Sequence, residues 1–143
     1  MELTIKRFDQ LSTPELYEIL RVRSAVFVVE QNCAYQDIDG EDLAAHHLWL
    51  RDEAGLKAYL RLLSLDEHTA KIGRVLTVER GKGHGARLLR AGIAAARDVL
   101  KKRSICIEAQ SYAIGFYERE GFQVISEEFL EDGIPHVRMR LDL

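Results

Sequence analysis

Hydrophobic and polar positions along the chain follow two periods, which predict a mixture of strands and helices. Near-alternation and short apolar runs bounded by turn residues are typical of strands. Such segments occur at 3–8, 47–51, 57–65, 71–78, 104–109, 122–125 and 137–141. Apolar residues spaced three and four apart indicate helices at 13–26, 86–100 and 112–120. This order of elements excludes a helical bundle and a pure β-sandwich, and it predicts a mixed α+β class.

The first helix has two candidate starting positions. Thr13 followed by Pro14 is typical of an N-cap before a first-turn proline, whereas Ser12 and Glu15 have the spacing of a capping box. Either start opens the same helix. The apolar stripe extends to about Val26, where we expect the helix to fray.

Length and composition predict one globular domain over residues 1–143, since 47% of the residues are hydrophobic and 30% are charged. Twenty Lys and Arg against 23 Asp and Glu give a net charge of −3, which argues against a nucleic-acid partner. No apolar run approaches the roughly 18 residues that a membrane span needs. Cys33 and Cys106 stand far apart and form no disulfide framework. We therefore expect a cytoplasmic protein with no membrane partner.

A glycine-rich segment, Arg80-Gly81-Lys82-Gly83-His84-Gly85, separates the strand ending near 78 from the long helix. Glycines allow backbone N–H groups to converge on an anion, and a helix N-terminus adds its positive dipole end. The spacing matches neither a P-loop nor the dinucleotide-binding fingerprint. The segment therefore predicts a phosphate-binding loop of another type, with a ligand-free flexible loop as the alternative.

Here the sequence resembles the GNAT acetyltransferases, whose coenzyme A loop has the pattern matched by Arg80, Gly83 and Gly85. The block at 116–122, Phe-Tyr-Glu-Arg-Glu-Gly-Phe, is similar to a second segment of that family, and the element order agrees. Further blocks resemble the ElaA-type branch at 26–33, 35–40, 72–75, 109–110 and 131–136. One departure is a segment before Arg80 that is about two residues shorter than is usual in the branch, which leaves open whether a bulge in the strand ending at Val78 serves the thioester as in the family.

The resemblance implies a central, mostly antiparallel sheet that splays at the cofactor and is flanked by helices. It also implies acetyl-CoA as cosubstrate, with the diphosphate on the N–H groups of 81–86 and the pantetheine beside 76–78. Gln110, at the end of its strand, would orient the pantetheine or the acceptor, or simply cap the strand. The implied cofactor-binding residues are Leu76, Thr77, Val78, Arg80, Gly81, Lys82, Gly83, His84, Gly85, Ala86, Gln110 and Tyr117.

Acetyl transfer from a thioester to an amine needs a base for the amine and a proton for the departing thiolate. Tyr117 is the candidate general acid, because a phenol with a pKa of about 10 is protonated at neutral pH; its alternative role is packing beside Phe116. His136 and Glu30 are the leading candidate bases, with Glu79, His46 or water left open. Cys33 is a further alternative, as an acyl-carrying nucleophile, but direct attack on the thioester is favoured.

Acidic residues in two segments of the chain predict the charge of the acceptor, which is an unidentified small molecule or peptide bearing a primary amine. They form either an anionic mouth for a cationic amine or a solvated acidic face: Asp37, Asp39, Glu41, Asp42, Glu127, Glu128, Glu131 and Asp132. Asp132-Gly133 predicts a hairpin turn within 131–136, with Pro135 limiting strand pairing.

We expect no metal site. Gly40 is misplaced for a calcium loop, and the adjacent His46 and His47 point oppositely on a strand. Two further possibilities stay open: a homodimer, and a catalytically silent acyl-CoA-binding regulatory module in place of an enzyme.

Overall fold

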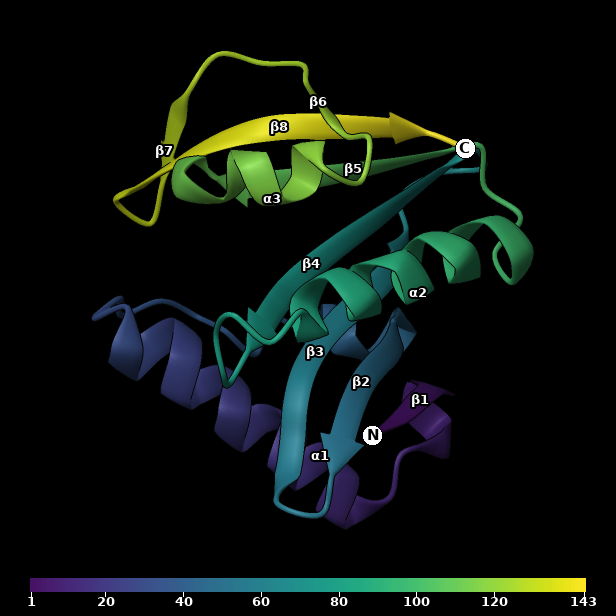
Figure 1. Cartoon of the computed structure of the whole chain (residues 1–143), viewed down its shortest axis with the longest axis vertical. Helices are drawn as coiled ribbons and strands as arrows, with labels where there is room; N and C mark the ends of the chain where they lie inside the picture. The colour runs from purple at the N-terminus through teal and green to yellow at the C-terminus, as the bar shows by residue number, and fades with distance from the viewer.

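The computed structural model describes residues 1–143 and forms one open sheet with helices against both faces (Figure 1). The strand order is β1-β2-β3-β4-β5-β8-β6, and β7 pairs with β8. Only β4 and β5 are parallel; the other neighbours are antiparallel. The strands are β1 Glu2–Arg7, β2 His46–Asp52, β3 Gly55–Ser64, β4 Thr69–Thr77, β5 Ser104–Gln110, β6 Gln123–Val124, β7 Phe129–Glu131 and β8 Ile134–Asp142. The predicted α+β class with a mostly antiparallel sheet is confirmed.

The helices divide between the two faces of the sheet. Helix α2 (His84–Asp98) packs Leu88 and Leu89 into the larger core cluster with Leu60 of β3. Helix α1 (Thr13–Arg23) lies on the opposite face, where Ile19 packs in the smaller cluster. Helix α3 (Ile114–Glu118) lies along β5 and β8 (Figure 1). None of the helices is long and apolar enough to cross a membrane.

Helix α1 begins with a capping box. The Ser12 hydroxyl accepts from the Glu15 N–H at 3.2 Å, and the Glu15 carboxylate accepts from the Ser12 N–H at 2.8 Å. The capping-box start is therefore the correct one of the two candidates. The expected α-helical end near Val26 is wrong, because the α-helix stops at Arg23 and Ser24–Glu30 continue as a π-helix.

The π-helix has backbone hydrogen bonds that span five residues. Gln31 N donates to Val26 O at 3.2 Å, and Cys33 N donates to Val28 O at 3.1 Å. Three of its seven residues are β-branched valines, which have a lowered α-helix propensity. This segment carries the chain into the loop that forms one wall of the site.

The sheet splits between β4 and β5. Their pairing covers only Thr69–Lys71 against Ser104–Cys106, and beyond it the two strands diverge (Figure 1). Strand β4 also contains a bulge, because the register shifts between the Leu76 and Gly73 pairs, and Arg74 between them has φ +53°. The rest of β4 and β5 thus flank an opening in the sheet.

The C-terminal hairpin partly corrects the prediction. Asp132 and Gly133 have φ of 51° and 76°, which confirms the expected tight turn. The preceding strand β7 was not predicted, and β8 begins at Ile134 rather than at 137. Pro135 is tolerated there because it lies beyond the last β5 partner, Gln110↔His136, so its missing N–H costs no bond to β5.

Candidate active site

A cavity of about 820 Å³ occupies the split in the sheet. Both strands that diverge there contribute to it, together with α3, the loop after the π-helix and the β7–β8 hairpin. Of the residues predicted to bind cofactor or act in catalysis, the cavity is lined by Leu76, Thr77, Arg80, Gly85, Gln110, Tyr117 and His136. Residues that the sequence placed far apart therefore meet at one opening.

The glycine loop connects β4 to the start of α2 at one end of this cavity. Gly81 and Gly83 have φ of 75° and 76°, a region that side chains rarely adopt. Gly85 is required for a different reason, since a Cβ there would lie 3.1 Å from Thr77 Cγ2 and 3.3 Å from Phe116 Cζ. The glycines therefore allow the turn and bring α2 close to β4 and α3.

Several predicted cofactor residues lie outside the cavity lining. They are Val78, Gly81, Lys82, Gly83, His84 and Ala86, on the loop and the first turn of α2. The N–H of Val78 donates to Lys57 O at 2.9 Å, so it is not available to a ligand. His84 Nδ1 is buried and has no hydrogen-bond partner.

Tyr117 is a buried side chain of α3 that reaches the cavity. Its ring packs edge-on against Phe116 at 5.0 Å and Phe122 at 5.9 Å between centroids. Burial raises the pKa of Tyr117 above its ordinary value. The phenol therefore stays protonated across the neutral range.

His136 of β8 is 7% exposed and also lines the cavity. Its ring stacks on Phe129 with an interplanar angle of 24°. Nδ1 lies 2.6 Å from the carbonyl oxygen of Ile134, which fixes the proton on Nδ1 in the neutral ring. Nε2 then carries the free lone pair and lies 3.6 Å from the Glu131 carboxylate.

The other candidate bases lie outside the cavity lining. Glu30 pairs with Arg80 at 3.0 Å, and Glu79 pairs with Lys57 at 2.6 Å. His46 is half-buried on β2, where burial lowers its pKa. Of the side chains considered as base, only His136 meets the opening.

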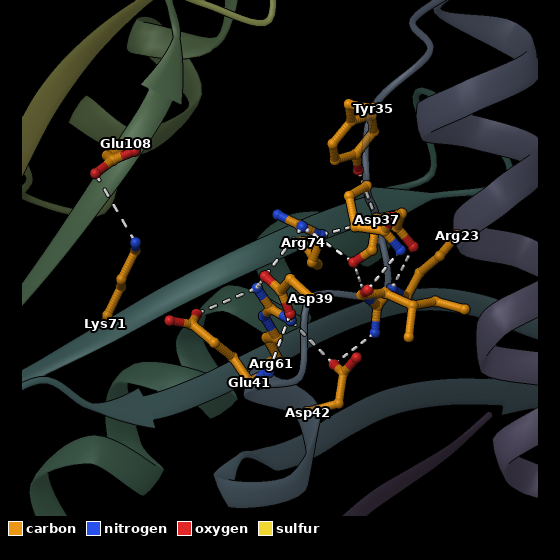
Figure 2. A network of polar contacts seen from close by, with 12 residues as sticks. Arg23, Tyr35, Asp37, Asp39, Glu41, Asp42, Arg61, Lys71, Arg74 and Glu108 are labelled. Carbon is orange, nitrogen blue, oxygen red and sulfur yellow. Dashed lines mark hydrogen bonds and ion pairs between the residues drawn. The ribbon is translucent and has the colours of Figure 1, made fainter.

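Four of the eight carboxylates expected at an anionic mouth are paired with arginines (Figure 2): Asp37, Asp39, Glu41 and Asp42. Arg23 is fully buried, with its guanidinium 2.6 Å from Asp42 Oδ1 and 3.1 Å from Asp37 Oδ2. Arg74 also contacts Asp37, at 2.8 Å. Asp37 and Asp42 therefore belong neither to a free anionic mouth nor to a solvated face, whereas Asp39, Glu41, Glu131 and Asp132 line the cavity.

Asp39 is held in the same network. Arg61 Nη2 lies 2.7 Å from Asp39 Oδ2, and this hydrogen bond holds the pKa of Asp39 well below its usual range although burial opposes it. Glu41 lies at 3.5 Å from the same guanidinium. The network fastens the loop after the π-helix to β3 and β4, so it builds a wall of the cavity.

Direct contacts join that wall to the far half of the sheet. The side-chain amides of Gln31 and Gln110 exchange hydrogen bonds of 3.2 and 3.4 Å, and Cys33 Sγ lies 3.6 Å from the carbonyl oxygen of Asp132. Two further residues of the site, Lys71 and Glu108, were not predicted. They lie where β4 and β5 begin to diverge. The alternation of apolar and polar residues along β5 could have indicated Glu108, because it places this side chain on the face opposite the core.

Comparison with known proteins agrees with this geometry. A family model described as an acetyltransferase (GNAT) domain matches residues 15–143. Escherichia coli ElaA is 41% identical over 139 residues, which cover 92% of this chain and 90% of ElaA. A UPF0039 protein of Schizosaccharomyces pombe is 41% identical over 147 residues, covering 100% of this chain and 98% of that protein.

Solved structures give the same result. The crystal structure of a Pseudomonas aeruginosa acyl-CoA N-acyltransferase superposes with a TM-score of 0.91 at 39% identity, covering 98% of this chain and 99% of that chain. The crystal structure of E. coli ElaA gives a TM-score of 0.89 at 36% identity, covering 97% of each chain.

The chain therefore belongs to the GNAT family, and it is an acyl-CoA-dependent N-acetyltransferase. Its similarity to ElaA over nearly all of both chains places it in the ElaA branch of that family.

Proposed function

We propose that the protein transfers an acetyl group from acetyl-CoA to a primary amine by direct attack of the amine on the thioester. The observation that carries this proposal is the cavity in the split sheet, which holds a buried phenol and a buried imidazole. Tyr117 and His136 both line it, with the glycine loop at its end. An acid, a base and an anion-binding loop are the three groups that this reaction needs.

The cofactor has a place in this arrangement. Its diphosphate would lie on the loop from Arg80 and on the first N–H groups of α2, where the helix dipole favours negative charge. Beyond Lys71 no strand pairs with the β5-facing edge of β4. The amides of pantetheine would pair with that free edge in the manner of an added strand.

The proton transfers follow from the two buried side chains. His136 Nε2 takes a proton from the acceptor ammonium, and the free amine attacks the thioester carbonyl carbon. The C–N bond forms, the C–S bond breaks, and Tyr117 donates its proton to the departing thiolate. The nitrogen then loses its second proton to give the neutral amide, and this proton returns through water to the Tyr117 phenolate. Glu30 has no proton-transfer role in this scheme, because its carboxylate is engaged by Arg80 outside the cavity.

Release of free thiol from acetyl-CoA over a panel of amines tests this function, with the acetylated product identified by mass. Thermal shift measures acetyl-CoA binding separately. Amine-dependent thiol release supports the proposal. Stabilisation by acetyl-CoA with no thiol release on any amine would instead indicate a silent acyl-CoA-binding module.

A further inference from the structure

The floor of the cavity carries a second set of charged residues, separate from the arginine network. Strand register places them on one face: Lys71 lies opposite Cys106, Gln110 opposite His136, and Glu131 opposite Ile134. Because side chains alternate along a strand, Glu108 shares this face with Gln110. Lys71, Glu108, Glu131 and His136 all line the cavity.

These four residues are incompletely balanced in charge. Lys71 Nζ lies 3.8 Å from Glu108 Oε1 across the fork of β4 and β5 (Figure 2). Glu131 has no cationic partner except a protonated His136. Its pKa is raised by burial and by the neighbouring Glu108. Arg138 lies opposite Glu108 in the strand register, but its guanidinium lies over the Phe129 ring and forms no ion pair with either carboxylate, and Arg138 is outside the cavity lining. When His136 is neutral, two carboxylates of the floor therefore face one ammonium, and the floor accepts one further positive charge.

The imidazole of His136 presents one nitrogen without a protein partner to the cavity. His136 is more than nine-tenths buried, and its Nδ1 is occupied by the Ile134 carbonyl. Nε2 has no partner within hydrogen-bond distance, since the nearest carboxylate oxygen is 3.6 Å away. Nε2 is accessible from the cavity, which His136 lines. An N–H donor entering the cavity would satisfy it.

We propose that the acceptor is a small diamine whose one amino group reacts at His136 while its second ammonium binds Glu108, with Glu131 between them. This inference rests on the proposed function. Glu108 lies two residues along β5 from Gln110, the partner of His136, which is a separation of roughly 7 Å. An extended chain of about four or five methylene groups spans that distance.

A small molecule fits the cavity better than a peptide does, because two walls of the cavity are in contact with each other. The hydrogen bonds between the side-chain amides of Gln31 and Gln110 cross from one wall to the other, and so does the contact of Cys33 with Asp132. An extended peptide chain would have to separate both pairs, whereas a free diamine enters beside them.

The experiment compares 1,5-diaminopentane with 5-amino-1-pentanol and 5-aminopentanoate, which keep the length and change the distal charge. We expect kcat/KM for the diamine to exceed that for the amino alcohol about tenfold or more, with the amino acid poorest. Glu108→Gln and Glu131→Gln should abolish the preference for the diamine. Glu127→Gln is the matched control, because Glu127 is exposed and outside the cavity lining.

Calorimetry with coenzyme A present separates this inference from the proposed function. Diamine binding that Glu108→Gln weakens, with no thiol release, would keep the diamine site and overturn the transferase scheme. Equal kcat/KM for diamine and amino alcohol would overturn the diamine site and keep the scheme. A preference for 5-aminopentanoate or for a lysine peptide, or no diamine binding at all, would also overturn the inference.

Discussion

Burial sets the chemistry of individual residues in this site in two ways. For Tyr117 it raises the pKa, so the phenol remains a proton donor at neutral pH. For His136 it brings the ring against the Ile134 carbonyl, and that contact chooses the tautomer whose Nε2 faces the cavity. Neither effect can be read from residue type alone, because both depend on the surroundings that the fold supplies.

Tyr117→Phe tests the acid directly. Both edge-to-face ring contacts remain in the variant, so we expect an unchanged melting temperature and an unchanged affinity for acetyl-CoA. We expect kcat to fall by roughly a hundredfold or more, since a positioned proton donor contributes at least that much. Steady-state kinetics on a reacting amine provide the measurement. A kcat equal to that of the wild type would mean that water protonates the thiolate.

Among the elements, the π-helix and the glycine loop are joined by an ion pair. Glu30 ends the π-helix, and its carboxylate holds the guanidinium of Arg80, the residue expected on the diphosphate. A cofactor phosphate and Glu30 would therefore compete for one guanidinium. The π-helix thus acts on the cofactor loop through charge, a role that the capping and periodicity of its sequence did not predict.

Glu30→Gln should tighten coenzyme A binding, because it frees Arg80 for the diphosphate. The pair is exposed, so the gain is modest, about two- to fivefold in Kd, and it should shrink as salt is raised. Calorimetry measures the affinity. Glu18→Gln is the control, since Glu18 forms a similar surface pair with Arg51 away from the loop. Lost turnover with unchanged affinity would restore Glu30 as a candidate base.

Gly83→Val tests the glycine loop. The substitution places a β-branched residue at φ +76°, and its side chain would stand where we propose that the backbone binds the diphosphate. We expect coenzyme A affinity to fall at least tenfold. Gly133→Val is the matched control, because Gly133 has the same φ of 76° and equally open surroundings. Both variants should lose similar stability, so equal affinities in the two would exclude the loop as the phosphate site.

For the molecule as a whole, the sequence predicted elements well and long-range pairs poorly. Periodicity located most strands and helices, and the glycine spacing located the loop, because those signals are local. The buried pairs of Arg23 with Asp42 and of Arg74 with Asp37 join distant segments, so no local pattern revealed them. The acidic run at 37–42 consequently resembled a solvated or substrate-facing surface, whereas Asp37 and Asp42 within it are buried against arginines.

A buried histidine makes the stability of the whole fold depend on pH. His47 is fully buried; Nδ1 lies 2.6 Å from the Tyr59 hydroxyl, and Nε2 lies 2.9 Å from the Asp42 carbonyl. Burial lowers its pKa, and the nearby Arg23 and Arg61 add to this, although Asp42 opposes it. The unfolded chain therefore binds the proton at a higher pH than the folded one. Stability should fall as pH drops below about 6.5 toward the lower folded value.

Urea unfolding at pH 7.5 and 5.5 measures this effect. Most of the stabilisation from the paired aspartates is lost only below pH 5.5, because their pKa values are lowered. The raised pKa of Glu131 makes the folded state more stable as the pH falls, which opposes the effect of His47. His46 contributes with the same sign, since burial lowers its pKa too. We therefore expect His47→Gln to reduce the loss of stability between the two pH values without removing it. The exposed His68, replaced by Gln, should leave the loss unchanged, and an equal loss in His47→Gln and wild type would show that His47 is not the titrating group.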